Sequence, residues 1–234
     1  MKKLKIGIIG VGRLGYEHAC NIANRVPGSE LVAIADANFD RAKQVAEELG
    51  VTAVYNDPKD LCADPNVEAV AIITNTASHV EMIKIAMDAG KHVFCEKPLA
   101  DTVEKCKEAE AIIAAHPELT FMLGFMRRYD HSYQVAKKKM ENGDIGDVIL
   151  VRCYSQGPIS IIEGTLEYAP RSGGQFIDMS IHDFDLIRWL TGSEVKELWA
   201  TGGCYEFKQY KDWDDGDNVS GLMMMEKDAM AFFF

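Results

Sequence analysis

A lysine followed by a proline stands directly after a short apolar run near the middle of the chain. The run His92-Val93-Phe94-Cys95 is typical of a buried parallel strand, and Glu96-Lys97-Pro98 follows it. Ligands of open α/β sheets bind beyond the carboxyl ends of the strands, so Lys97 is placed to touch a substrate. Its ammonium group can donate a hydrogen bond to a substrate oxygen, or titrate if it is desolvated. The alternative interpretation is a solvated loop lysine.

Asp178 and His182 form a second candidate pair, four residues apart in a segment that we predict to be one helix over residues 175–190. This spacing places them on one face, with Asp185 one turn further on. A histidine oriented by an aspartate can act as a general base near neutral pH. The helix is apolar and therefore buried, so these polar groups must be paired or line a cleft. The alternative is a core histidine with satisfied hydrogen bonds, while Asp185 pairs with Arg188.

The start of the chain carries the pattern of a dinucleotide site. An apolar strand, residues 4–9, leads into Gly10-Val11-Gly12-Arg13-Leu14-Gly15 and then into a predicted helix. Gly10 permits the tight turn, Gly12 lets the backbone approach a pyrophosphate, and Gly15 lets the helix pack closely. A second strand ends at Asp36, about 20 residues further on, where an acid is suited to the ribose hydroxyls. The pattern predicts NAD rather than NADP, although the nearby Arg41 would soften that preference.

Alternating strands and helices predict the architecture that must position these residues. Strands are expected at 4–9, 31–35, 53–55, 69–73, 92–95 and 120–123, with helices between them. This winding predicts an α/β fold with a Rossmann-type, doubly wound parallel sheet in a domain over residues 1–124. Residues 125–234 begin with helices and end in strands at 195–204, 218–225 and 229–234. A further strand is expected at 147–154, between the helices over 129–142 and 175–190. Together these elements predict an α+β domain with a mostly antiparallel sheet, for substrate binding and oligomerisation.

Composition restricts the class of partner. The chain has 25 basic and 36 acidic residues and a formal charge of −11, which argues against nucleic acid or an anionic membrane as a partner. No run approaches the length of a membrane span, and no signal-peptide core is present. The six cysteines form no CxxC pair, and neither they nor the histidines have the spacing of a metal site. We therefore predict a cytoplasmic enzyme without a metal.

Four ordered motifs resemble the Gfo/Idh/MocA oxidoreductases, and within them most closely the bacterial inositol 2-dehydrogenases. The motifs are Gly10–Gly15, Glu96-Lys97-Pro98, the stretch Gly124-Phe125-Met126-Arg127-Arg128-Tyr129-Asp130, and the stretch from Gly173 to Asp183. The resemblance implies NAD-dependent oxidation of a secondary hydroxyl of a cyclic polyol, first of all myo-inositol to its 2-keto product. It also implies a homo-oligomer, a tetramer in full-length relatives.

The resemblance implies roles for individual residues. Lys97, Asp178 and His182 would be catalytic: His182, oriented by Asp178, would take the hydroxyl proton, and Lys97 would stabilise the developing charge. The same three residues and Arg127 would bind substrate, although Arg127 and Arg128 could instead be solvated charges. The bond before Pro98 is expected to be cis. The residues expected to bind the cofactor are Gly10, Gly12, Arg13, Leu14, Gly15, Asp36, Thr74, Asn75, His79 and Glu96. For His79, a purely structural place at a helix start is the alternative.

Two features depart from the family pattern. Gly157 stands before Pro158, where inositol dehydrogenases often carry an acid, so one expected polyol contact is missing. The chain is also shorter than its family, so we expect a C-terminally truncated second domain whose last strand is an unpaired edge. The alternative functions are oxidation of another polyol or hexose, such as scyllo-inositol or a glucose-type sugar, and an NAD-binding protein left inactive by truncation.

Overall fold

The computed structural model describes residues 2–234, and these divide into two compact units. The units are Met1–Gly124 and Phe125–Phe234. Within the described residues, no helix is both long and apolar enough to cross a membrane.

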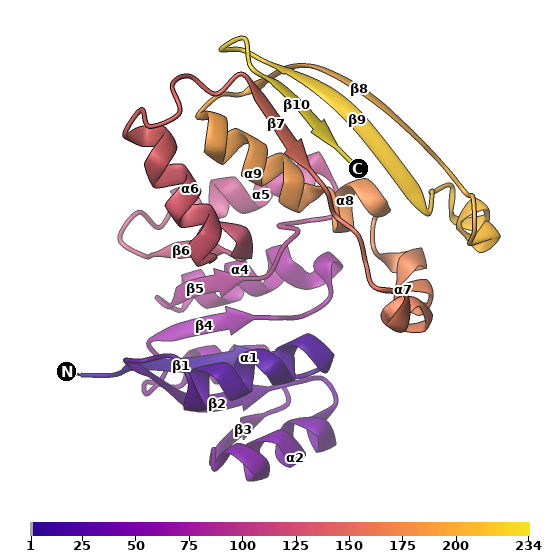
Figure 1. The fold of residues 1–234 in the computed structure, drawn as a ribbon. Helices are drawn as coiled ribbons and strands as arrows, with labels where there is room; N and C mark the ends of the chain where they lie inside the picture. The colour runs from indigo at the N-terminus through magenta and orange to yellow at the C-terminus, as the bar shows by residue number, and fades with distance from the viewer. Residues whose placement is uncertain (1) are drawn as a thin grey trace. The chain divides into compact units, whose positions relative to one another are not determined.

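The first unit is built on a six-stranded parallel sheet with the strand order β3-β2-β1-β4-β5-β6 (Figure 1). Its strands are β1 (Leu4–Ile9), β2 (Ser29–Ala35), β3 (Ala53–Tyr55), β4 (Ala69–Ile72), β5 (His92–Cys95) and β6 (Phe121–Leu123). Its helices are α1 (Arg13–Asn24), α2 (Phe39–Leu49), α3 (Pro58–Ala63), α4 (His79–Asp88) and α5 (Val103–Ala114).

Helices cover both faces of this sheet because its strands are apolar on both sides. Consecutive side chains of a strand point to opposite faces, and in β1 both Ile8 and Ile9 are buried. Ile8 packs in the core formed with α1 and α2, whereas Ile9 packs in the core formed with α3, α4 and α5. A strand buried on both faces has no solvated side, as in other parallel sheets. The predicted doubly wound parallel sheet is therefore confirmed.

The second unit contains a four-stranded sheet with the order β7-β10-β9-β8. Its strands are β7 (Leu150–Cys153), β8 (Val195–Gly203), β9 (Asn218–Met225) and β10 (Met230–Phe233). Its helices are α6 (His131–Glu141), α7 (Ile162–Tyr168), α8 (Gln175–Asp178) and α9 (Ile181–Thr191). Neighbouring strands run antiparallel except β10 and β7, which are parallel. The predicted mostly antiparallel sheet is confirmed.

The core of the second unit lies between α9 and one face of this sheet. Leu186, Ile187 and Leu190 of the helix pack with Ala231 and Phe233 of β10. The prediction that the last strand is an unpaired edge is wrong, because β10 hydrogen-bonds to β9 on one side and to β7 on the other. The pairing with β9 is local, since the two strands are consecutive, but β7 lies far earlier in the chain, and local patterns do not encode that pairing.

The single helix predicted over residues 175–190 is also wrong. The helix is interrupted at Met179 and Ser180, which separate α8 from α9. The amide of Ser180 donates to the carbonyl of Gln175, five residues back, and the amide of His182 donates to Met179, three residues back. Asp178 and His182 therefore do not share one continuous helix face. The apolar pattern continues across the break, which is why the sequence did not reveal it.

Two consecutive arginines before α6 are paired with buried acids of α9. Arg127 donates to Asp183 and, at 2.6 Å, to the hydroxyl of Ser155, which itself lies 2.8 Å from Asp183. Arg128 binds Asp185 with its Nε and Nη2 at 2.8 and 2.6 Å. Asp183 and Asp185 are almost fully buried. Buried carboxylates need such partners, so both arginines form ion pairs with α9, although the Arg128 side chain stays 38% exposed.

Arg188 pairs with Glu194 rather than with Asp185, again contrary to the sequence alternative. The two groups form two hydrogen bonds of 2.7 Å, but both side chains are about half exposed. Glu194 raises the pKa of Arg188, mainly through these hydrogen bonds. Glu194 is 60% exposed whereas Asp185 is 4% exposed, so the Arg188–Glu194 pair is a natural comparison for the Arg128–Asp185 pair, whose acid is buried.

We expect the substitution Arg128→Met to lower the free energy of unfolding by about 2 kcal/mol or more, because it leaves Asp185 buried without its cation. The matched substitution Arg188→Met should cost less than about 1 kcal/mol, because its pair is exposed to water. Urea unfolding followed by circular dichroism measures both. Equal losses in the two variants would contradict this account of α9.

Candidate functional site

The glycine loop between β1 and α1 folds as tightly as the sequence predicts. Gly10 has a φ of +90°, and a Cβ there would lie 2.4 Å from the carbonyl oxygen of Ile73. A Cβ on Gly15 would lie 2.1 Å from the carbonyl oxygen of Gly10. Any larger side chain at these positions forces the backbone to shift. By contrast, a Cβ on Gly12 would meet no atom within 4 Å, so its surroundings are open.

The first turn of α1 is arranged to receive an anion. Gly12 is the N-cap of this helix and supplies no side-chain hydrogen bond to it. Arg13 and Leu14, which follow, are both exposed. The first amides of a helix lack partners within the helix and carry its positive end, so they suit a pyrophosphate. This arrangement fits the dinucleotide predicted from the sequence.

Asp36, at the end of β2, holds the glycine loop. Its carboxylate accepts hydrogen bonds of 2.7 Å from the amides of Val11 and Asn38. Arg41 donates to the carbonyl of Val11 at 3.2 Å and lies over the ring of Tyr16 at 5.1 Å. The backbone N–H and C=O of Val11 are thus both held by side chains, one from the residue after β2 and one from α2. In dinucleotide-binding folds an acid at the end of the second strand usually binds the adenosine ribose, so Asp36 fits the expectation from the sequence.

The loop after β4 contains three residues expected to bind the cofactor, and they are placed differently. Asn75 is exposed and Thr74 is half-buried, its hydroxyl accepting a 2.7 Å hydrogen bond from Ser78. His79, the first residue of α4, is only 1% exposed. Its Nδ1 lies 2.8 Å from the carbonyl oxygen of Pro98 and its Nε2 lies 3.3 Å from that of Thr74. A side chain this buried offers little surface to a cofactor.

Glu96, Lys97 and Pro98 follow β5 as predicted, and the bond between Lys97 and Pro98 is cis, as the family resemblance implied. The Glu96 carboxylate accepts a 3.1 Å hydrogen bond from the amide of Lys97 and lies 2.8 Å from Nε2 of His18. Burial by itself would raise the pKa of Glu96, but His18 and the Lys97 backbone together lower it below its ordinary value. His18, on α1, was not singled out from the sequence.

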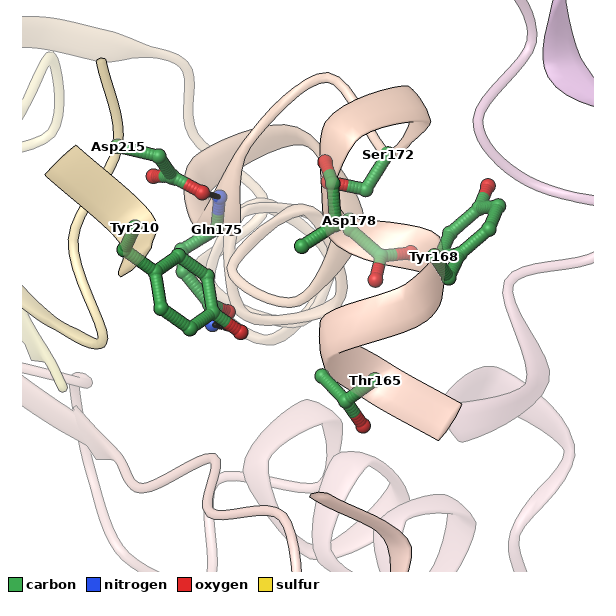
Figure 2. A pocket seen from close by; sticks show the side chains of 8 residues that line it. Thr165, Tyr168, Ser172, Gln175, Asp178, Tyr210 and Asp215 are labelled. Atoms are coloured by element: carbon green, nitrogen blue, oxygen red, sulfur yellow. Dashed lines mark hydrogen bonds between the residues drawn. The ribbon is translucent and has the colours of Figure 1, made fainter. Parts of the chain in front are cut away.

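In the second unit, Asp178 lines a small polar cavity. Its lining residues come from α7, α8, the turn between these helices, and the segment between β8 and β9. Figure 2 labels Thr165, Tyr168, Ser172, Gln175, Asp178, Tyr210 and Asp215. The amide of Gln175 donates to Asp215 at 3.1 Å. Burial, followed by the charge of Asp215, raises the pKa of Tyr210. The cavity holds about 10 Å³, room for about one water molecule and not for a ring.

His182 is the second residue of α9, next to the buried Asp183 that Arg127 binds. The network of Arg127, Asp183 and Ser155 therefore fixes the start of the helix that carries His182. The sequence had suggested Arg127 as a substrate ligand, and the structure gives it these protein partners. Neither Asp183 nor Ser155 was singled out from the sequence, because nothing local marks a partner 56 or 28 positions away. Among the described residues, no group of three or more histidines, cysteines or acids is arranged to hold a metal ion.

Comparison with known families accounts for almost the whole chain. Residues 4–125 match the model of the GFO_IDH_MocA oxidoreductase family, described by its NAD-binding Rossmann fold. Residues 133–234 match the model of the GFO/IDH/MocA C-terminal domain. The resemblance seen in the sequence motifs is thereby confirmed, and the first unit is an NAD-binding Rossmann domain.

Individual relatives are similar along nearly the full chain. Myo-inositol 2-dehydrogenase of Thermotoga maritima is 40% identical over 235 residues, covering 97% of this chain and 67% of that protein. The scyllo-inositol 2-dehydrogenase (NAD(+)) of Bacillus subtilis is 37% identical over 217 residues, covering 91% and 62%. A crystal structure of scyllo-inositol dehydrogenase from Lactobacillus casei, with bound NAD(H) and scyllo-inositol, has a TM-score of 0.93 at 39% identity, covering 99% and 69%. The chain spans about two thirds of the length of these relatives.

We expect Gly12→Ala to change the free energy of unfolding by less than about 1 kcal/mol, because its Cβ enters open space. The same substitution should weaken NADH binding about tenfold, because the methyl group occupies the approach of the pyrophosphate. Gly15→Ala should instead cost about 2 kcal/mol or more in stability, because its Cβ meets a carbonyl oxygen. Thermal unfolding and NADH fluorescence titration separate the two effects. Wild-type NADH affinity in Gly12→Ala would show that the pyrophosphate does not approach Gly12.

Proposed function

We propose a function from the premise that this chain belongs to the Gfo/Idh/MocA oxidoreductase family: NAD-dependent oxidation of a secondary hydroxyl of a cyclic polyol. Myo-inositol, oxidised to its 2-keto product, is the first candidate substrate. Relatives named as inositol dehydrogenases, one of them crystallised with NAD(H) and scyllo-inositol, support this substrate class. The catalytic residues predicted from the sequence take their roles within this proposal.

The observation that carries the proposal is the order of functional groups along one edge of the first sheet. The strands β2, β1, β4 and β5 are neighbours in that order. Their carboxyl ends lead to Asp36, the glycine loop, Thr74 and Lys97 respectively. With the adenosine ribose at Asp36 and the pyrophosphate at α1, the rest of the dinucleotide extends across β4 toward β5. That direction brings the reactive end of the cofactor toward Lys97.

The proposed reaction assigns one task to each catalytic residue. His182 accepts the proton of the substrate hydroxyl, and Asp178 orients the imidazole. Lys97 donates a hydrogen bond to the same oxygen and stabilises its negative charge while the C–H bond breaks. NAD supplies the acceptor for the hydride that leaves the carbon. The products are a ketone, NADH and one proton, so atoms and electrons balance.

A different ring substrate is the second candidate, and Gly157 favours it. This exposed residue has no side chain and therefore offers no acidic contact to a polyol. Scyllo-inositol or a glucose-type hexose would then be oxidised by the same residues. An NAD-binding protein without turnover remains the third candidate.

We also propose a cytoplasmic location and a homo-oligomeric assembly. All six cysteines are thiols, as is usual in a reducing compartment. For assembly, the face of the second sheet opposite α9 exposes a row of apolar side chains. These are Leu150, Tyr154, Trp199, Met230, Phe232 and Phe234, each at least 36% exposed. We call them the apolar sheet face, and an apolar surface of this kind is typical of a contact with another copy of the chain.

We expect the purified chain to form NADH from NAD and myo-inositol, measured by absorbance, and Lys97→Ala to lower the rate at least about 100-fold. Lys105→Ala is the matched control, because Lys105 pairs with Asp101 on the surface of α5 and should leave the rate unchanged. Scyllo-inositol and glucose are assayed beside myo-inositol. Turnover that survives in Lys97→Ala would overturn the proposed role of this lysine. If the chain binds NADH but turns over none of these substrates, the candidate function of an NAD-binding protein without turnover is favoured.

Light scattering after gel filtration tests the assembly. At micromolar concentration the wild-type chain is expected to have the mass of a dimer or a larger species. The double substitution Trp199→Lys and Phe232→Lys should give a monomer, because charges on the apolar sheet face oppose its burial. Val103→Lys replaces another exposed apolar side chain, on α5, and should leave the mass unchanged. A monomeric wild type, or an unaltered mass in the double variant, contradicts the proposed interface.

A further inference from the structure

The backbone around Lys97 is hydrogen-bonded to the side chain of the preceding Glu96 and to the side chain of His79, and Glu96 in turn contacts His18. Before the lysine, the Glu96 carboxylate accepts the Lys97 amide at 3.1 Å and lies 2.8 Å from Nε2 of His18. After the lysine, the carbonyl oxygen of Pro98 lies 2.8 Å from Nδ1 of His79. We define His18, Glu96 and His79 as the lysine brace.

Two close contacts fix the Glu96 side of the brace. A Cβ on Gly124 would lie 3.1 to 3.3 Å from the atoms of the Glu96 carboxylate group, so the carboxylate packs against the bare backbone of that glycine. The His18 ring lies 5.5 Å from the ring of Phe94, on β5. The side chains of His18 and Glu96 are 27% and 14% exposed, so water competes weakly for this pair. The helix that begins at the glycine loop is thereby linked to the segment that carries Lys97.

The His79 side of the brace is buried more deeply. Burial lowers the pKa of His79 and so favours the neutral ring, which carries one N–H. Of its two carbonyl neighbours, Pro98 is nearer, at 2.8 Å against 3.3 Å for Thr74. The shorter distance assigns the proton to Nδ1 and the donated hydrogen bond to Pro98. The chain immediately after the lysine is therefore fixed from α4.

A brace matters at this position because lysine is a long and flexible side chain. Regular pairing of β5 with its neighbours ends at Cys95, two residues before Lys97. Catalytic groups must stay within roughly 0.5 Å of their productive position, which requires a fixed backbone and surrounding hydrogen bonds. A displacement of about 1 Å can lower a rate about 100-fold.

We propose that His18 and His79 are positioning residues that hold the backbone of Lys97 from its two sides for hydride transfer. Neither ring is assigned contact with the substrate. His79 was expected from the sequence to touch the cofactor, and the brace gives it a different task. The expected loss of reaction rate rests on the proposed dehydrogenase function. The expected loosening of the Lys97 backbone rests only on contacts within the first unit.

Matched substitutions separate the donated hydrogen bond from the bulk of each ring. The amide nitrogen of glutamine stands near the position of Nε2 in histidine, and that of asparagine near Nδ1. His18→Gln and His79→Asn therefore keep a donor toward Glu96 and Pro98, whereas His18→Leu and His79→Leu remove it. Thermal unfolding first establishes which variants are folded.

The first measurement is hydrogen exchange of the Lys97 amide, followed by mass spectrometry on the full chain, and it does not depend on activity. In His18→Leu this amide should exchange at least about tenfold faster, because Glu96 loses the partner that holds its carboxylate. His18→Gln should restore most of the protection. Unchanged exchange in a folded His18→Leu variant overturns the brace, even if the chain has no dehydrogenase activity.

The second measurement is a kinetic cycle with Lys97→Met, using NAD and the best polyol of the panel. His18→Leu and His79→Leu should each lower kcat about 10- to 100-fold, while the NADH dissociation constant of His18→Leu stays within about threefold. In the Lys97→Met background the same substitutions should lower the residual rate less than about threefold, because they act through the lysine.

The donor-keeping variants His18→Gln and His79→Asn should recover most of kcat. An equal loss in both backgrounds, or no recovery, would assign the histidines a merely structural role. If Lys97→Met has no measurable rate, the hydrogen exchange of the Lys97 amide and the recovery of kcat in the donor-keeping variants decide whether the histidines position the lysine.

Discussion

The close approach of Gly15 to Gly10 is the contact on which the first unit depends. The space for a Cβ at Gly15 is taken by the Gly10 carbonyl oxygen, so α1 begins directly over the end of β1. Only from this start does the helix present its first amides at the sheet edge and place His18 against Phe94 of β5. Asp36 secures the same loop from β2 through the Val11 amide. One steric requirement thus orders the dinucleotide loop and one side of the lysine brace together.

The second unit relies on a different constraint, the compensation of buried charge. Asp183 and Asp185 lie two positions apart on α9 and are both almost fully buried. Arg127 and Arg128, adjacent in the chain, neutralise one each. Since an unpaired buried carboxylate is costly, the helix is stable only in the register that satisfies both acids. This register also determines where His182 stands at the start of the helix.

The sequence predicted those site residues whose conformation or position depends only on residues nearby in the chain. Gly10 and Gly15 are required by local backbone geometry, and Lys97 follows a strand whose apolar run is easily recognised. The break between Asp178 and His182 was missed because apolar residues continue through it with helical spacing. His18 was missed because its partner, Glu96, is 78 positions away. Pairings across such distances depend on how the sheet is ordered, which hydrophobic patterns do not specify.

The position of β10 between β7 and β9 has a consequence for how the two units fold. In the first unit, successive strands are mostly neighbours joined through one helix, so their pairing closes short loops. In the second unit, Leu150 of β7 pairs with Met230 of β10, after α7, α8, α9, β8 and β9 have intervened. Such non-local pairing carries a larger loop-closure entropy and is formed slowly. The second sheet is therefore the kinetically demanding part of the chain, and its unfinished form exposes strand edges to aggregation while the dinucleotide unit can already be native.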